Sequence, residues 1–202
     1  MTDLIKESLY LFPDSILFGS IFVGLTTLSK QHILFFLSCL VSLGSLFGIQ
    51  NITSFLYGSS LSPIKCKPTL FKYTFEQLFL RPSANSPSYG MFLVSFATTY
   101  LATSLYMLKD ELDVLDLSNA KQYYISISLL VLLSIVYLMI RLTNECETSG
   151  SAISGLFFGS LIGALLVNLN VQLFGKDSIN FLGIPLLRNR TADGKPIYIC
   201  SN

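Results

Sequence analysis

The sequence predicts an all-α membrane protein: a polytopic bundle of about five membrane-spanning helices, with interfacial helices and a short C-terminal tail. Two observations favour this fold. Of the 202 residues, 51% are hydrophobic and only 12% are charged, whereas soluble domains carry about 25% charged residues. The charged residues are also clustered, which leaves apolar windows that can each hold the roughly 20 residues needed to cross a bilayer. Helices are expected because backbone groups in lipid must be paired within the segment.

Five windows are interpreted as spans, and they share an apolar composition and a helical length: 12–29, 32–49, 89–108, 122–140 and 152–174. The first span begins with Pro13 and Asp14. Both residue types favour the first turn of a helix, so we expect its N-terminus at the membrane interface. The turn between the first two spans is so short that these helices must be antiparallel neighbours.

Amphipathic patterns predict further structure outside the spans. In residues 2–12 and 69–80, apolar side chains lie opposite charged ones at helical spacing, which indicates two interfacial helices. The tail has two apolar stretches around Asp193-Gly194, a pattern typical of a β-hairpin. We therefore expect two parts, a bundle at 1–174 and a tail at 175–202. Because a lone hairpin is marginally stable in water, the tail should pack on the bundle or on a partner protein.

Five spans divide the connecting segments between two faces of the membrane. Face A holds the N-terminus and the loops at 50–88 and 141–151, and face B holds the turn at Lys30, the acidic loop at 109–121 and the tail. Of the 13 Lys and Arg residues, face A carries about as many as face B. The positive-inside rule needs an imbalance, so the orientation and the membrane of residence stay open.

Few residues are available for catalysis. The single histidine, His32, lies in the short turn on face B and is interpreted as an interfacial side chain. The four cysteines (Cys39, Cys66, Cys146 and Cys200) lack the C-x-x-C spacing of a structural zinc site. No acid or base is expected to be buried inside a span, which argues against an ion pathway. We expect no catalytic residue, metal, cofactor or nucleic-acid partner.

Three stretches assigned to face A nevertheless form a pattern, and they are Cys66-Lys67-Pro68, Pro82-Ser83-Ala84-Asn85, and Arg141 with Glu147, Ser151, Gly155, Gly159 and Gly163. In order, spacing and position at helix starts, they resemble the type-2 phosphatidate phosphatase superfamily, the lipid phosphatases related to vanadium haloperoxidases. The resemblance covers roughly residues 57–170. It implies a polytopic helical bundle whose motifs meet on face A.

The first two motifs of this family are only partly retained. Lys67, followed by Pro68, takes the place of a phosphate-binding arginine. Pro82 and Ser83 match the second motif, but Asn85 replaces the histidine that acts as general acid.

The third motif has lost its catalytic pair. Arg141 matches the family's arginine, whereas Glu147 stands at the nucleophilic histidine and Ser151 at the aspartate that orients it. A phosphohistidine intermediate needs an imidazole, and a carboxylate in that place repels phosphate. The resemblance therefore implies a pseudoenzyme, in which Glu147 close to the pocket would pair with Arg141 and neutralise it.

The same residues have a purely structural interpretation. Small residues every fourth position, from Ser151 to Gly163, are typical of any membrane helix that packs closely against another. They predict contact between the third and fifth spans. The resemblance further implies a Cys66–Cys146 disulfide, since each cysteine precedes a matched motif position. Two unrelated free thiols remain the alternative.

Two functions remain open. The first is a non-catalytic structural membrane protein that anchors or scaffolds a larger assembly, with membrane lipids and other proteins of that assembly as partners. A similarity to polytopic inner-membrane proteins of large DNA viruses implies a virion inner membrane. The alternative is a lipid-active protein, either a diverged phosphatase or a headgroup binder acting through its bases on face A: Lys65, Lys67, Lys72, Arg81 and Arg141. Convergence of those bases in one pocket would favour the alternative.

Overall fold

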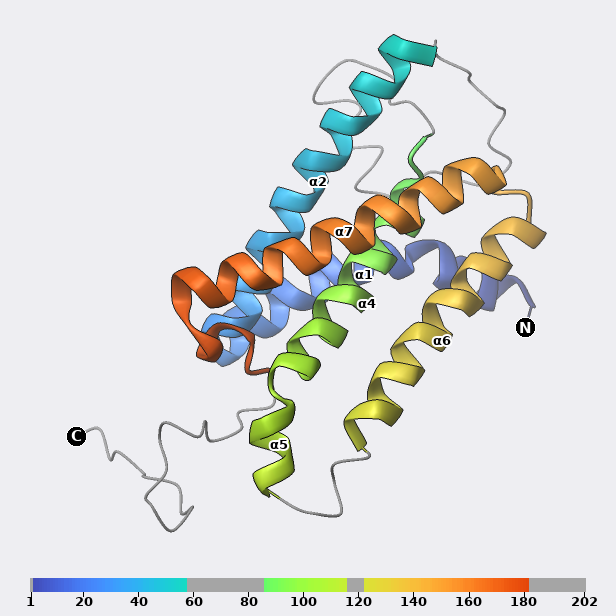
Figure 1. The fold of residues 1–202 in the computed structure, drawn as a ribbon. Helices are drawn as coiled ribbons and strands as arrows, with labels where there is room; N and C mark the ends of the chain where they lie inside the picture. The colour runs from blue at the N-terminus through green and yellow to red at the C-terminus, as the bar shows by residue number, and fades with distance from the viewer. Residues whose placement is uncertain (1, 58–85, 116–121, 182–202) are drawn as a thin grey trace.

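The computed structural model describes residues 2–57, 86–115 and 122–181, with side chains placed in 11–55, 86–112 and 123–181. In these ranges all regular elements are helical, which confirms the predicted all-α bundle (Figure 1). The helices are α1 (Thr2–Thr27), α2 (Lys30–Tyr57), α4 (Tyr89–Met107), α5 (Lys109–Leu115), α6 (Gln122–Thr143), α7 (Ser149–Phe174) and the 3-10 helix η2 (Lys176–Ile179). The predicted interfacial helix at 69–80 and the hairpin around Asp193 lie outside the described residues.

Four helices are long and apolar enough to cross a membrane, and these segments are Lys30–Phe55, Tyr89–Met107, Tyr123–Thr143 and Ser149–Phe174. The apolar part of α1, Leu11–Thr27, is shorter. Its 17 residues are at the lower limit of the range of about 17–25 residues for a spanning helix. The described residues therefore contain four helices able to span a membrane, as expected of a multi-pass membrane protein, and a shorter apolar helix before them.

The start of the first span differs from the prediction. We expected a separate interfacial helix over 2–12 and a span starting at about Phe12 with Pro13 in its first turn, but α1 continues through Pro13 without a break. A proline inside a helix removes one backbone hydrogen bond, whereas two new helix ends would leave several backbone groups unpaired at membrane depth. Continuing the helix is the smaller cost. Asp14 is therefore inside a helix and does not cap one.

Helix α4 is the centre of the bundle, and α7 packs along it (Figure 1). Both helices start at a capped N-terminus. The Ser88 hydroxyl accepts a hydrogen bond from Met91 N (3.2 Å), and the Thr148 hydroxyl accepts one from Ser151 N (3.3 Å). Such side-chain caps satisfy N–H groups that the helix cannot pair internally. They define where the two helices begin.

The glycine stripe of α7 lies at this contact. A Cβ added to Gly155 would lie 2.8 Å from the Ser88 carbonyl oxygen, and one added to Gly163 would lie 2.7 Å from the Phe96 carbonyl oxygen. At Gly159 an added Cβ would clash with the Ser95 hydroxyl and with the α4 backbone. Only residues without a side chain allow two helix backbones to approach this closely. The predicted contact between the third and fifth spans is thus confirmed, and the small residues of α7 lie in it.

Polar and aromatic side chains complete the core toward face B. The buried Asn170 amide of α7 donates to Ser38 Oγ on α2 (2.9 Å) and to Tyr100 Oη on α4 (2.6 Å). The Phe35 ring packs edge-on against Tyr100 and Phe181, with ring centroids 5.0 and 5.9 Å apart. The chain after α7 thus folds back onto the bundle, so residues 175–181 of the predicted tail belong to the core.

Candidate functional site

Four helix ends meet at face A, where the sequence placed the degenerate motifs. Ser88 N, just before α4, donates to the Ser151 carbonyl in the first turn of α7 (3.0 Å). Near the end of α2, Gln50 Nε2 donates to the Pro87 carbonyl (2.8 Å). The C-terminal end of α6 joins them through Arg141, described next. The expected grouping of the 50–88 and 141–151 segments at one end of the bundle therefore holds for the described residues.

A buried ion pair links α6 to the start of α7. Arg141 lies in the last turn of α6, and the chain then turns back through Glu145, which has a left-handed φ of 52°. This turn brings Glu147 beside Arg141, whose Nε donates to Glu147 Oε1 at 3.0 Å and whose Nη2 donates to the same oxygen. The side chains are 11% and 8% exposed. The expected neutralisation of Arg141 by Glu147 is confirmed.

A tyrosine hydroxyl lies next to this pair. Tyr137, one turn before Arg141, is buried, and its ring centroid is 5.9 Å from the Arg141 guanidinium carbon. A Cβ on Gly90 would lie 2.5 Å from Tyr137 Oη and 3.6 Å from Glu147 Oε1. The missing side chain at Gly90 therefore makes room for the Tyr137 hydroxyl. Among the described residues, Tyr137 Oη and Glu147 Oε2 have no hydrogen-bond partner.

A second carboxylate belongs to the same end of the bundle, contrary to the prediction. We expected no buried acid inside a span, yet Asp14 is 3% exposed and accepts a hydrogen bond from the Tyr89 hydroxyl (3.0 Å). The ring of Phe12, two residues before Asp14, packs against Tyr137 with ring centroids 5.9 Å apart, which places Asp14 at this end of the bundle. The physical reason for the error is that the hydroxyl of Tyr89, 75 residues away, compensates for the burial of the carboxylate.

We define the face-A cluster as Asp14, Tyr89, Tyr137, Arg141 and Glu147. It contains one guanidinium, two carboxylates and two phenols, and every member is buried or nearly so. None of these groups is an imidazole, and His32 lies at the opposite end of α2 from Gln50. Within the described residues, no group of three or more His, Cys, Asp or Glu side chains could hold a metal ion.

The structure covers only part of the predicted motif set. Lys67, Pro68, Pro82, Ser83 and Asn85 lie outside the described residues. Ser151 is buried at the start of α7, where its carbonyl bonds to Ser88 and its N–H bonds to the Thr148 cap. It faces the α4–α7 contact together with Gly155.

The two cysteines in the described residues differ. Cys39 is free and buried inside α2, whereas Cys146, next to Glu147, is disulfide-bonded. Its predicted partner Cys66 lies outside the described residues, so the Cys66–Cys146 pairing stays a prediction.

Sequence reasoning missed three members of the cluster, Asp14, Tyr89 and Tyr137. One signal was available, because Asp14 is the single charged residue between Glu7 and Lys30. An isolated carboxylate in an apolar window is expensive and calls for a partner. For the two tyrosines no comparable signal exists, because tyrosine is common where membrane helices meet the interface and does not by itself indicate a buried site.

Together, the fold and the cluster define a multi-pass helical membrane protein with buried and internally paired charges at one end of the bundle. No family model, no curated protein and no solved structure matches this chain. The resemblance to the lipid phosphatases therefore stays a prediction.

Proposed function

We propose that this chain is a non-catalytic structural membrane protein. In this proposal a phosphatase-like bundle anchors or scaffolds a larger membrane assembly, and the family's catalytic site survives only as a packed polar cluster. The similarity to inner-membrane proteins of large DNA viruses leads us to extend the proposal to a virion inner membrane.

The Arg141–Glu147 ion pair is the observation that carries the proposal. The arginine that would bind a phosphate is bound by a carboxylate that stands where the family has its nucleophile. A phosphate entering here would have to displace Glu147. Separating a buried ion pair costs about 3–5 kcal/mol because the carboxylate is left uncompensated, and the two anions would also repel each other.

The lack of an activating base supports the same conclusion. Lipid dephosphorylation needs a nucleophile, a proton donor for the leaving alcohol and cations around the phosphate. The single histidine, His32, is in the first turn of α2, while Gln50 marks face A on the same helix. At 1.5 Å per residue, these 18 positions are about 27 Å apart. An amide at Asn85 does not deliver a proton near neutral pH.

The enzymatic half of the proposal is tested with the purified protein in detergent. Incubation with phosphatidate and with a lipid pyrophosphate should release no phosphate above a detergent blank. Turnover that disappears in a Glu147→Ala or Ser83→Ala variant would overturn the proposal and favour the lipid-active alternative.

The scaffolding half is tested by gentle solubilisation of the protein from its native membrane. We expect a complex of higher mass in which the same proteins co-purify at fixed ratios. Two results together would contradict a structural role. One is recovery of the isolated chain without partner proteins, and the other is an unchanged membrane composition after deletion of its gene.

The headgroup-binding alternative has less support. Of its five proposed bases, only Arg141 lies in the described residues, and Glu147 already occupies it. The other four bases, Lys65, Lys67, Lys72 and Arg81, lie outside those residues.

A further inference from the structure

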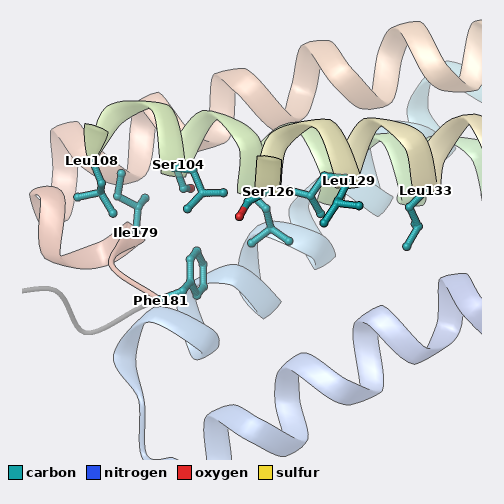
Figure 2. A pocket seen from close by; sticks show the side chains of 10 residues that line it. Ser104, Leu108, Ser126, Leu129, Leu133, Ile179 and Phe181 are labelled. Atoms are coloured by element: carbon teal, nitrogen blue, oxygen red, sulfur yellow. The ribbon is translucent and has the colours of Figure 1, made fainter. Parts of the chain in front are cut away.

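A long groove runs along the side of the bundle between α6 and the helices α1, α2 and α4. It consists of two adjoining cavities of about 420 and 370 Å³ that share lining residues from α4, α6 and the segment after η2: Leu101, Leu130, Leu133 and Phe181. The larger cavity extends along α1 past Phe12 and Gly19 toward His32. The smaller one ends at Leu108 and Ile179 (Figure 2).

The lining is chemically suited to hydrocarbon. Most of its side chains are aliphatic or aromatic, and its hydroxyl groups are mainly bonded within the protein. Thr98 Oγ1 and Ser134 Oγ are 2.7 Å apart, and the Ser104 hydroxyl donates to the Tyr100 carbonyl (2.8 Å). The groove therefore offers little to a polar ligand or to ordered water, which needs two or more polar partners.

The groove is continuous with the surface that faces lipid. Leu129 and Leu133 line it from α6 and remain 59% and 43% exposed. Helix α6 crosses the membrane with most of its surface uncovered, so the opening beside these leucines lies at the depth of the acyl chains. If the groove were empty, its lining atoms would lack dispersion contacts on the side that faces it. Filling the groove with hydrocarbon is therefore favourable.

The groove is elongated and opens on its side toward lipid. Its lining on α4 runs from Val94 to Leu108, which at 1.5 Å per residue is about 21 Å. Because it opens beside the exposed leucines of α6, the hydrocarbon chains of the bilayer reach it directly. An extended acyl chain matches both its elongated form and its apolar lining.

We propose that this groove binds one acyl chain of a membrane phospholipid. The chain fills the space between α1 and α6 and supplies the packing that α6 lacks from the protein. The site is separate from the face-A cluster, and the inference does not depend on the proposed structural function.

Two exposed glycines provide a matched pair of variants. Gly19 on α1 lines the groove, and Gly44 on α2 lines neither cavity. Both are helical, and a Cβ at either would meet no atom within 4 Å. Gly19→Phe should fill the groove, whereas Gly44→Phe makes the same chemical change on an open face. Because both Cβ positions are open, we expect both variants to fold.

The experiment uses the full chain in nanodiscs made of phosphatidylcholine with a diazirine on one acyl chain, and photolabelled peptides are mapped by mass spectrometry. We expect label concentrated at Leu101, Leu130 and Leu133. Labelling of these peptides should fall about fivefold or more in Gly19→Phe, because a filled groove leaves no space for the chain, and should stay unchanged in Gly44→Phe.

Two results would overturn the inference. One is label spread evenly over the exposed faces of α2, α6 and α7 without enrichment in the groove. The other is equal labelling of Gly19→Phe and the parent protein. A photoreactive residue at Leu133 adds an independent measurement. A one-lipid product that is lost when Gly19→Phe is added supports the proposal, and a product with the mass of two chains refutes it.

Discussion

The helices α4 and α6 are both clear spans, yet the bundle holds them in opposite ways. In α4, 61% of the spanning window is buried inside the protein, against 11% in α6. Helix α4 contacts α7 backbone to backbone across the glycine stripe. Helix α6 packs into the protein chiefly through Tyr137, which lies in a small cluster with Met91 and Ala152. Two polar contacts add to this attachment, the Thr98–Ser134 hydrogen bond in the membrane and the Arg141–Glu147 pair at face A.

This difference separates a packed core from an attached helix. Dispersion between close backbones holds α4 and α7 together, and such contact tolerates no added volume. The small cluster around Tyr137 and a few directional polar contacts hold α6 and leave room beside it for the proposed acyl chain. Substitutions should therefore act through volume in the first region and through charge or hydrogen bonding in the second.

The largest effect is expected from Glu147→Ala at the attachment of α6. Removing the carboxylate leaves the Arg141 guanidinium buried without this counter-charge, which costs about 3–5 kcal/mol. At roughly 2–4 °C per kcal/mol for a chain of this size, the thermal midpoint in detergent should fall by about 10 °C. The double variant Arg141→Met/Glu147→Leu should recover at least half of that loss. If Glu147→Ala leaves the midpoint unchanged, α6 is held by something other than the ion pair.

The second effect tests the α4–α7 contact through added volume. Gly159→Leu places a side chain against Ser95 and the Phe92 carbonyl, and we expect destabilisation near the upper end of about 1–3 kcal/mol for overpacking. The control is Gly44→Leu, whose side chain enters open space. Equal melting of the two variants would mean that the glycine stripe does not set the helix separation.

The smallest effect concerns the hydrogen bond between α4 and α6. Ser134→Ala removes the partner of the Thr98 hydroxyl, and hydrogen bonds between membrane helices are worth about 0.6 kcal/mol on average. The matched control is Ser45→Ala, because the Ser45 hydroxyl bonds only to the carbonyl of Val41 in its own helix. A loss above about 2 kcal/mol would show that α6 depends on this bond far more than the comparison implies.

The sequence was sufficient to predict the apolar helices, but it did not predict how the first of them, α1, begins. The start of α4 at Tyr89 and the end of α7 at Phe174 agree with the predicted boundaries, since an apolar window without charges has few alternative structures in lipid. The glycine spacing likewise predicted a close helix contact. The continuation of α1 through Pro13 was not predictable. It depends on the free-energy cost of ending a helix inside the membrane, and composition does not show how deep Pro13 lies.

Of the face-A cluster, only the Arg141–Glu147 ion pair could be predicted from the sequence. Arg141 and Glu147 are six residues apart, so local geometry and opposite charge were enough to expect their contact. Asp14 and Tyr89 are brought together from distant parts of the chain, and no periodicity of one sequence encodes such a contact. Tyr137 reaches the site because Gly90 lacks a side chain, which only the folded packing shows.

The unequal lengths of α4 and α7 have a consequence for the bilayer itself. Their spans of 19 and 26 residues correspond to about 29 and 39 Å, and both share one hydrocarbon slab of about 30 Å. Helix α4 matches that thickness upright, whereas α7 exceeds it and is accommodated by tilting or by a locally thicker bilayer. Figure 1 shows α7 lying obliquely across α4. A thicker bilayer would allow α7 to stand more upright and would exceed the length of α4. Bilayer thickness would therefore change the angle at which α4 and α7 cross at the glycine contact.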